Sequence, residues 1–140
     1  MIAIASDHAG YELKSAIIKH LEARGIACDD MGTHDPEASV DYNDYGLMVA
    51  EAVTKGTHEK GIIICGTGIG ISISANKVPG AIAALCTDTY MARMSREHNN
   101  ANILALGARV TGVGSALEIV DVWLNSSFLG GRHQRRVDKF

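Results

Sequence analysis

The chain has 140 residues, a length typical of one domain that buries a substantial core. Charged residues make up 21% and the formal net charge at pH 7 is −3, which argues against nucleic acid or an anionic membrane as the main partner. No apolar run approaches a membrane span, and the N-terminus lacks the basic start and apolar stretch of a signal peptide. Three cysteines without metal-type spacing favour a reducing cytoplasm over a disulfide framework. We therefore expect one cytoplasmic domain covering residues 1–140.

The hydrophobic pattern predicts short apolar strands that alternate with amphipathic helices. The first helix shows the pattern clearly, since Leu13, Ile17 and Leu21 fall on one face. We expect Thr87 or Asp88 to cap the fourth helix. In chain order, strands are expected at 1–5, 26–30, 61–65, 81–86 and 103–106, and helices at 11–24, 43–55, 71–77, 88–98 and 113–124.

Strands that alternate with helices form βαβ units, which give a parallel sheet covered by helices on both faces. The predicted fold is a single-domain, Rossmann-like three-layer sandwich with a five-stranded parallel sheet. Ligands of such sheets bind outside the carboxyl ends of the strands. This rule places Asp7 and His8, residues 65–70 and Asp88 on one rim, so we expect a functional site there.

The third strand ends in a cysteine and a loop with alternating glycines, Cys65-Gly66-Thr67-Gly68-Ile69-Gly70. Glycines permit positive φ angles and let peptide N–H groups converge on an anion. Ile71 stands where the dinucleotide fingerprint needs glycine and where a cysteine-dependent phosphatase needs arginine, and the loop lacks the lysine of a P-loop. The loop therefore fits a small anion or a developing oxyanion. The alternative is a plain strand-to-helix turn with a buried structural cysteine.

Cys65 is the candidate chemical centre, as a nucleophile or a general base. A cysteine at a strand end that faces a helix N-terminus favours the thiolate form. Cys28 and Cys86 lie in apolar strands and are expected to be packing residues. The hydroxyl of Thr67 points either at a ligand or only into the turn.

Polar residues late in the chain supply further candidates. His98 is expected to end the fourth helix, where the helix dipole favours a protonated ring and hence a proton donor. Asn99 and the asparagines after it are either site residues or helix caps. We expect no metal ion, because the histidines lack any short ligand spacing.

The C-terminal tail, about residues 130–140, is strongly basic. It contains Arg132, Arg135 and Arg136, and arginine suits a bidentate grip on phosphate. The alternative is a solvated charged end. Arg109, after the fifth strand, is a further candidate for binding an anion.

Four motifs in register make the sequence resemble the type B ribose-5-phosphate isomerases, within a wider sugar-phosphate isomerase family that includes the subunits of galactose-6-phosphate isomerase. The resemblance covers essentially the whole chain. The motifs are SDHAG at 6–10, CGTGIGIS at 65–72, SREHN at 95–99 and GGRHQRRV at 130–137.

The resemblance implies an aldose–ketose isomerase of the non-oxidative pentose phosphate pathway. It would interconvert ribose 5-phosphate and ribulose 5-phosphate through a cis-enediolate, without a metal or another cofactor. Cys65 would be the base that moves the proton between C1 and C2. His98 would be the acid that opens the furanose ring, assisted by Thr67. The peptide N–H groups of residues 66–70 (Gly66, Thr67, Gly68, Ile69 and Gly70) would form the oxyanion site.

The same resemblance assigns binding roles to the remaining candidates. Asp7 would hold sugar hydroxyls, and Asn99 and Arg109 would complete the pocket. The phosphate would be held by His8, Arg132 and Arg136. Some family members use a glutamate further along the loop instead of the cysteine. In this chain the residue ten places after Cys65 is Ala75, so the cysteine version applies.

The family also implies a homodimer or a dimer of dimers whose sites are shared between subunits. We expect His98, Asn99 and Arg109 to come from the neighbour of the chain that supplies Cys65. Two alternatives remain open. One keeps the mechanism but acts on a six-carbon sugar such as allose or galactose 6-phosphate. The other is a non-catalytic sugar-phosphate-binding module on a flavodoxin-like sheet, which would need no thiol.

Overall fold

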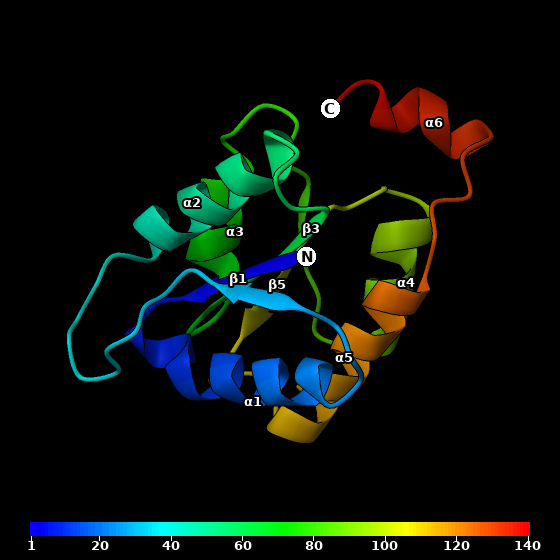
Figure 1. Cartoon of the computed structure of the whole chain (residues 1–140). Coiled ribbons are helices and arrows are strands. Elements are labelled where there is room, and N and C mark those ends of the chain that lie inside the picture. The colour runs from blue at the N-terminus through cyan, green and yellow to red at the C-terminus, as the bar shows by residue number, and fades with distance from the viewer.

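A computed structural model describes all 140 residues, and strands and helices alternate along the chain (Figure 1). The strands are β1 (Ile2–Ser6), β2 (Cys28–Asp30), β3 (Lys60–Cys65), β4 (Ala83–Leu85) and β5 (Ile103–Gly107). The helices are the short 3-10 turn η1 (His8–Gly10), α1 (Tyr11–Glu22), α2 (Tyr42–Thr54), α3 (Ile69–Ala75), α4 (Thr89–Glu97), α5 (Val113–Asn125) and α6 (Arg132–Val137).

The five strands form one parallel sheet in the order β2-β1-β3-β5-β4, which confirms the predicted fold class. The chain leaves β1 toward one edge of the sheet and β3 toward the other, so the β1/β3 pair is the topological switch point. Open α/β sheets bind their ligands outside the strand ends at this point.

None of the helices has both the length and the apolar character needed to cross a membrane.

Alternate residues of the central strands face opposite sides of the sheet. Ile62 and Ile64 pack in a core with residues of α1, α4 and α5. Ile63 and Cys65 pack in a second core with residues of α2 and α3. Figure 1 shows α2 and α3 on one side of the sheet, and α1 and α5 on the other. The strand pattern therefore puts Cys65 on the α2/α3 side.

The predicted element boundaries differ from the structure by a few residues. β2 and β4 are shorter than predicted, because each is an edge strand with a partner on one side only. α3 starts at Ile69, two residues before the predicted start. The tail also forms the helix α6, which the sequence pattern missed because this short charged segment has no apolar periodicity.

Side chains occupy both edges of the sheet. At the β4 edge, the amide of Asn76 donates to the carbonyl of Ala83 at 3.0 Å and accepts from its N–H at 2.7 Å. At the other edge β2 has three residues, and the carboxylate of Asp29 pairs with His58 at 2.8 Å. Neither edge presents a long row of free backbone groups.

A buried lysine fixes the segment beside the end of β1. Lys14 on α1 is 0% exposed, and its Nζ donates to Asp30 Oδ1 and to the carbonyl of Thr33, both at 2.6 Å. The N–H of Thr33 donates in turn to the carbonyl of Ser6 at 2.7 Å. The ammonium group therefore holds this segment against the residue that directly precedes Asp7.

Replacement of Lys14 by methionine tests this role. Lys14→Met keeps a stem of similar length but removes the ammonium donor of the Asp30 carboxylate and of the Thr33 carbonyl. We expect the free energy of unfolding in urea to fall by about 1–3 kcal/mol. Lys19→Met on the exposed side of the same helix is the control and should change it by less than about 0.5 kcal/mol. Equal effects of the two substitutions would contradict a structural role of the buried ammonium.

Candidate active site

A hollow of about 460 Å³ opens where β1 and β3 end, at the topological switch point. It is lined by Asp7, Tyr42, Cys65, Gly66, Thr67, Ile69, Gly70 and Ile73. The structure therefore brings Asp7 after β1 together with the glycine loop after β3, as predicted, whereas His8 does not line this hollow. Asp88, which is also predicted on this rim, does not line the hollow. It caps α4, as predicted, by accepting a hydrogen bond from the N–H of Met91 at 2.7 Å.

Cys65 ends β3 and is 4% exposed, with its sulfur on the wall of the hollow. The Sγ atom accepts a hydrogen bond from the N–H of Gly68 at 3.1 Å. The carbonyl of Cys65 accepts from the N–H of Ala108 at 2.9 Å, which ties the residue to the end of β5. The thiol is therefore held in one place by backbone groups on two sides.

The glycines at 68 and 70 are required by their surroundings. Gly68 has a φ of +81°, and a Cβ there would lie 2.5 Å from Cδ1 of Leu85 and 2.9 Å from the carbonyl carbon of Leu106. A Cβ at Gly70 would lie 2.5 Å from Cζ of the Tyr42 ring. Any larger side chain would push the loop away from β5 or from α2, and with it the N–H that holds the sulfur.

The loop keeps several peptide N–H groups free. Gly68 donates to the sulfur, and Ile69 donates to Oγ1 of Thr67 at 3.2 Å. The N–H groups of Gly66, Thr67 and Gly70 make no hydrogen bond within the chain. Of the five donors predicted for an oxyanion, these three are available beside the thiol.

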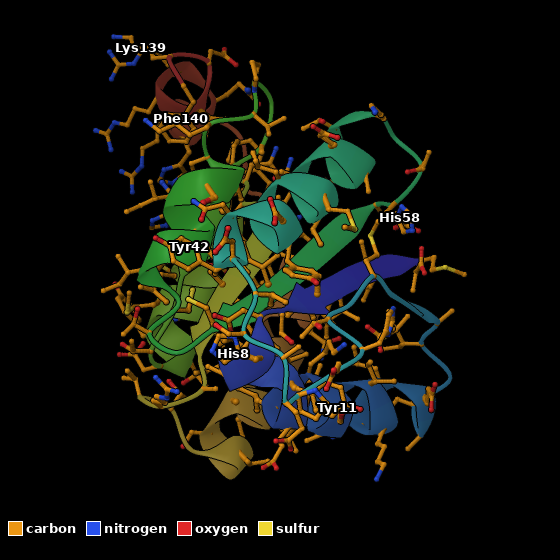
Figure 2. The ribbon with its side chains drawn as sticks, turned by 90° about the vertical axis from the view of Figure 1, so that its left-hand side faces the viewer. His8, Tyr11, Tyr42, His58, Lys139 and Phe140 are labelled. Atoms are coloured by element: carbon orange, nitrogen blue, oxygen red, sulfur yellow. The ribbon has the colours of Figure 1, made fainter.

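Asp7 and His8 are fixed by the turn that follows β1. Asp7 is 6% exposed, and its Oδ1 accepts from the N–H of Gly10 at 3.2 Å. Nδ1 of His8 accepts from the N–H of Val40 at 3.2 Å. In the neutral ring the proton then sits on Nε2, which is left free to donate. Figure 2 shows His8 and Tyr42 on the same side of the molecule.

Arg109 lies beside the loop of its own chain. Its N–H donates to the carbonyl of Gly66 at 2.9 Å, and a Cβ on Gly66 would lie 3.5 Å from Nη1 of Arg109. The expectation that a neighbouring subunit supplies Arg109 next to Cys65 is therefore wrong. The reason is topological, because β3 and β5 are adjacent and the residues that follow them meet.

The other predicted residues lie elsewhere in the chain. His98 and Asn99 follow α4, and Arg132 and Arg136 lie on α6. Asn99 lines a larger hollow of about 820 Å³ together with Val137 and Phe140. Figure 1 shows α6 at the opposite end of the molecule from η1, and Figure 2 shows Phe140 far from His8. One chain therefore holds two separate groups of predicted site residues.

Tyr42 is a wall of the hollow that sequence reasoning missed. It begins α2, and its ring covers Gly70 while remaining 39% exposed. Nothing near Tyr42 in the sequence distinguishes it from a surface aromatic. The only sign in the sequence of the contact with Tyr42 is that residue 70 is a glycine.

No three His, Cys, Asp or Glu side chains are grouped as they would be to hold a metal ion.

The other two cysteines are packing residues, as predicted. Cys86 is 1% exposed within the α1/α4/α5 core, and Cys28 packs against that core from β2. Burial raises the pKa of the Cys86 thiol to about 11. Burial, with Glu22 and Asp30 nearby, also raises the pKa of the Cys28 thiol. Both groups therefore stay neutral thiols at neutral pH.

Alkylation kinetics should separate the three cysteines. Iodoacetamide at pH 7 should modify Cys65 first, because this residue lines an open hollow. It should leave Cys86 unmodified, because the thiolate is the reactive form and the raised pKa keeps Cys86 a thiol. Labelling of Cys86 should grow as the pH approaches about 11, where its thiol ionises. Mass spectrometry of the proteolytic peptides measures each site. Faster labelling of Cys86 than of Cys65 at pH 7 would contradict the assignment.

The sequence and the fold are similar to those of known proteins. Residues 2–140 match the family model described as Ribose/Galactose Isomerase. Ribose-5-phosphate isomerase B of Escherichia coli is 49% identical, over 98% of this chain and 91% of the relative. The structure of Clostridium thermocellum ribose-5-phosphate isomerase B superposes with a TM-score of 0.97 at 63% identity, covering 99% of this chain and 93% of that chain. The Mycoplasma genitalium ribose-5-phosphate isomerase B with bound ribulose-5-phosphate gives 0.95 at 44% identity, covering 99% and 91%. The chain belongs to the ribose/galactose isomerase family.

Proposed function

We propose that the protein interconverts ribose 5-phosphate and ribulose 5-phosphate. The observation that carries the proposal is the thiol of Cys65, held by Gly68 in a hollow that also contains Asp7 and free peptide N–H groups. An aldose–ketose isomerase needs a base beside donors for a developing oxyanion, and this hollow offers both. The bound ribulose-5-phosphate in the Mycoplasma genitalium relative supports a pentose phosphate as the substrate.

The first step of the proposed mechanism opens the furanose ring. His98 donates a proton to the ring oxygen as the bond from that oxygen to C1 breaks. The C1 hydroxyl releases its proton to water, and C1 becomes an aldehyde. His98 is the C-cap residue of α4, so its ring lies at the negative end of the helix dipole. Thr67, which is exposed on the rim of the hollow, would assist by binding the substrate there.

The second step moves a proton between neighbouring carbons. The Cys65 thiolate takes the proton from C2, and the electron pair passes to the C1 oxygen to give the cis-enediolate. The free N–H groups of Gly66, Thr67 and Gly70 would stabilise that charge. The O2 proton then passes to O1, and return of the proton from sulfur to C1 gives the ketose and regenerates the thiolate. No metal ion takes part in this scheme.

The substrate would be bound along the rim of the hollow. Asp7 would accept hydrogen bonds from sugar hydroxyls, and Arg109 would close the pocket next to Gly66. His8 would donate from Nε2 to the phosphate at one end. Arg132 and Arg136, exposed on α6, would hold the phosphate by bidentate contacts.

Because α6 and the end of α4 lie far from the hollow in one chain, we propose that a second copy supplies them. Asn99 would enter the pocket together with His98 of the partner subunit. Ile69 and Ile73, which line the hollow, are 52% and 54% exposed, and an aliphatic wall of this kind is what a partner chain would cover. The domain would therefore work as a homodimer, or as a dimer of dimers, with the basic segment 130–140 completing the neighbour's phosphate site.

The first experiment is an assay of purified protein with ribose 5-phosphate in the presence of EDTA. Turnover that persists in EDTA and disappears after alkylation supports the thiol-based isomerase. Turnover of only allose or galactose 6-phosphate would keep the mechanism but change the sugar. Calorimetric binding of these phosphates without any turnover would leave a sugar-phosphate-binding module.

Cys65→Ala should abolish proton transfer and leave substrate binding intact. We expect kcat to fall by about a hundredfold to ten-thousandfold, the range for loss of an acid–base group, with KM little changed. Cys28→Ala is the control, because that thiol only packs against the core, and it should keep nearly full kcat. Near-normal turnover by Cys65→Ala would show that another group is the base.

Two inactive variants should complement each other if the site is shared. Cys65→Ala and His98→Ala chains, co-expressed with different tags and purified as mixed dimers, should contain one intact site in each dimer. Such dimers should recover about half of the normal kcat per dimer. Homodimers of each variant, assayed in parallel, should stay inactive with ribose 5-phosphate. Mixed dimers without activity would contradict the sharing of His98 and Cys65 between subunits.

A further inference from the structure

A second histidine lies face to face with His98. His98 is the C-cap residue of α4, and His133 lies in the first turn of α6. Their ring centroids are 4.1 Å apart and their planes are inclined by 13°, which is a stacked arrangement. His133 is 8% exposed, whereas Arg132, Gln134, Arg135 and Arg136 around it are exposed. The helix therefore turns one side chain inward, and that side chain covers the His98 ring.

The stack holds His98 in a way that leaves its nitrogen atoms free. Other histidines of the chain are fixed by hydrogen bonds through the ring. Nε2 of His20 pairs with Asp121 and Nε2 of His58 pairs with Asp29, both at 2.8 Å. A nitrogen bonded to a carboxylate is not available to a substrate. A ring held by its face keeps both nitrogens available, as a proton donor requires.

The backbone keeps the two rings together. The N–H of Leu129 donates to the carbonyl of Glu97, the last residue of α4, at 3.0 Å. This bond ties the segment that leads into α6 to the residue directly before His98. The N–H of His133 donates to the carbonyl of Gly130 at 3.0 Å, which places His133 within the same turn.

We propose that His133 is a positioning residue that holds the imidazole of His98 for ring opening by stacking on its face. The inference rests on the ring-opening role proposed above for His98. Because Arg132 and Arg136 lie on the same short helix, the residue that positions the acid and the residues proposed to hold the phosphate form one unit. A phosphate bound to the arginines would then lie at a fixed place relative to the acid.

The charges around the stack support this division of roles. The ring of His98 faces His133, and the charges of Arg132 and Arg136 on α6 also act on it. Burial first, and then these three neighbours, lower the pKa of His133. Two charged imidazole rings in face-to-face contact would repel each other. A neutral His133 avoids this repulsion.

Two substitutions at position 133 separate the stack from the packing. His133→Phe keeps a planar ring of similar size but has no nitrogen, and His133→Leu fills the buried space without a planar ring. With ribose 5-phosphate, we expect His133→Leu to lower kcat by about tenfold while KM changes by less than about twofold. His133→Phe should recover most of the lost kcat. Gln134→Ala on the exposed side of α6 is the control for disturbance of the helix.

Other results would overturn the inference. Full kcat in His133→Leu would show that the stack is not needed. Equal losses in the Leu and Phe variants would show that the ring nitrogens of His133 matter, and failure of both variants to fold would show a general structural role. His98→Ala is measured in the same series. Full activity of His98→Ala would remove the proposed ring-opening role itself, so the two failures are distinguishable.

Discussion

The hydrogen bond from Gly68 N–H to the sulfur of Cys65 depends on close contact between the glycine loop and β5. Gly68 sits against the backbone of Leu106 and the side chain of Leu85 with a positive φ, and no other residue fits there without strain. The same contact places Gly66 beside Arg109, and three residues that line the hollow keep free N–H groups. The chemistry proposed for the site therefore depends on how tightly one turn packs between two strands.

The order of the strands determines which residues meet. Only the pair β1/β3 lies at the switch point, so Asp7 and Cys65 share a hollow, whereas Asp88 after the edge strand β4 serves as a helix cap. The alternation of side chains along β3 puts Cys65 in the core formed with α2 and α3. Tyr42 at the start of α2 consequently becomes a wall of the hollow.

The fold and half of the site follow from local patterns in the sequence. Alternating strands and helices predict the parallel sheet, and the rule for strand ends brings Asp7 to the glycine loop. Other features depend on which residues, far apart in the sequence, come together in the folded chain. The position of Arg109 follows from the adjacency of β3 and β5, which no local pattern reveals. The separation of His98 from Cys65 within one chain, and the contact of Tyr42 with Gly70, are likewise set by the packing of whole elements.

The side chains at the two sheet edges limit how two copies of the chain associate. A continuous sheet across two molecules needs strands with free N–H and C=O groups along the outer edge. The amide of Asn76 already bonds both such groups of Ala83, and the short β2 carries acidic residues, one of them paired with His58. Two copies would therefore meet through helices and loops and would each keep a separate five-stranded sheet.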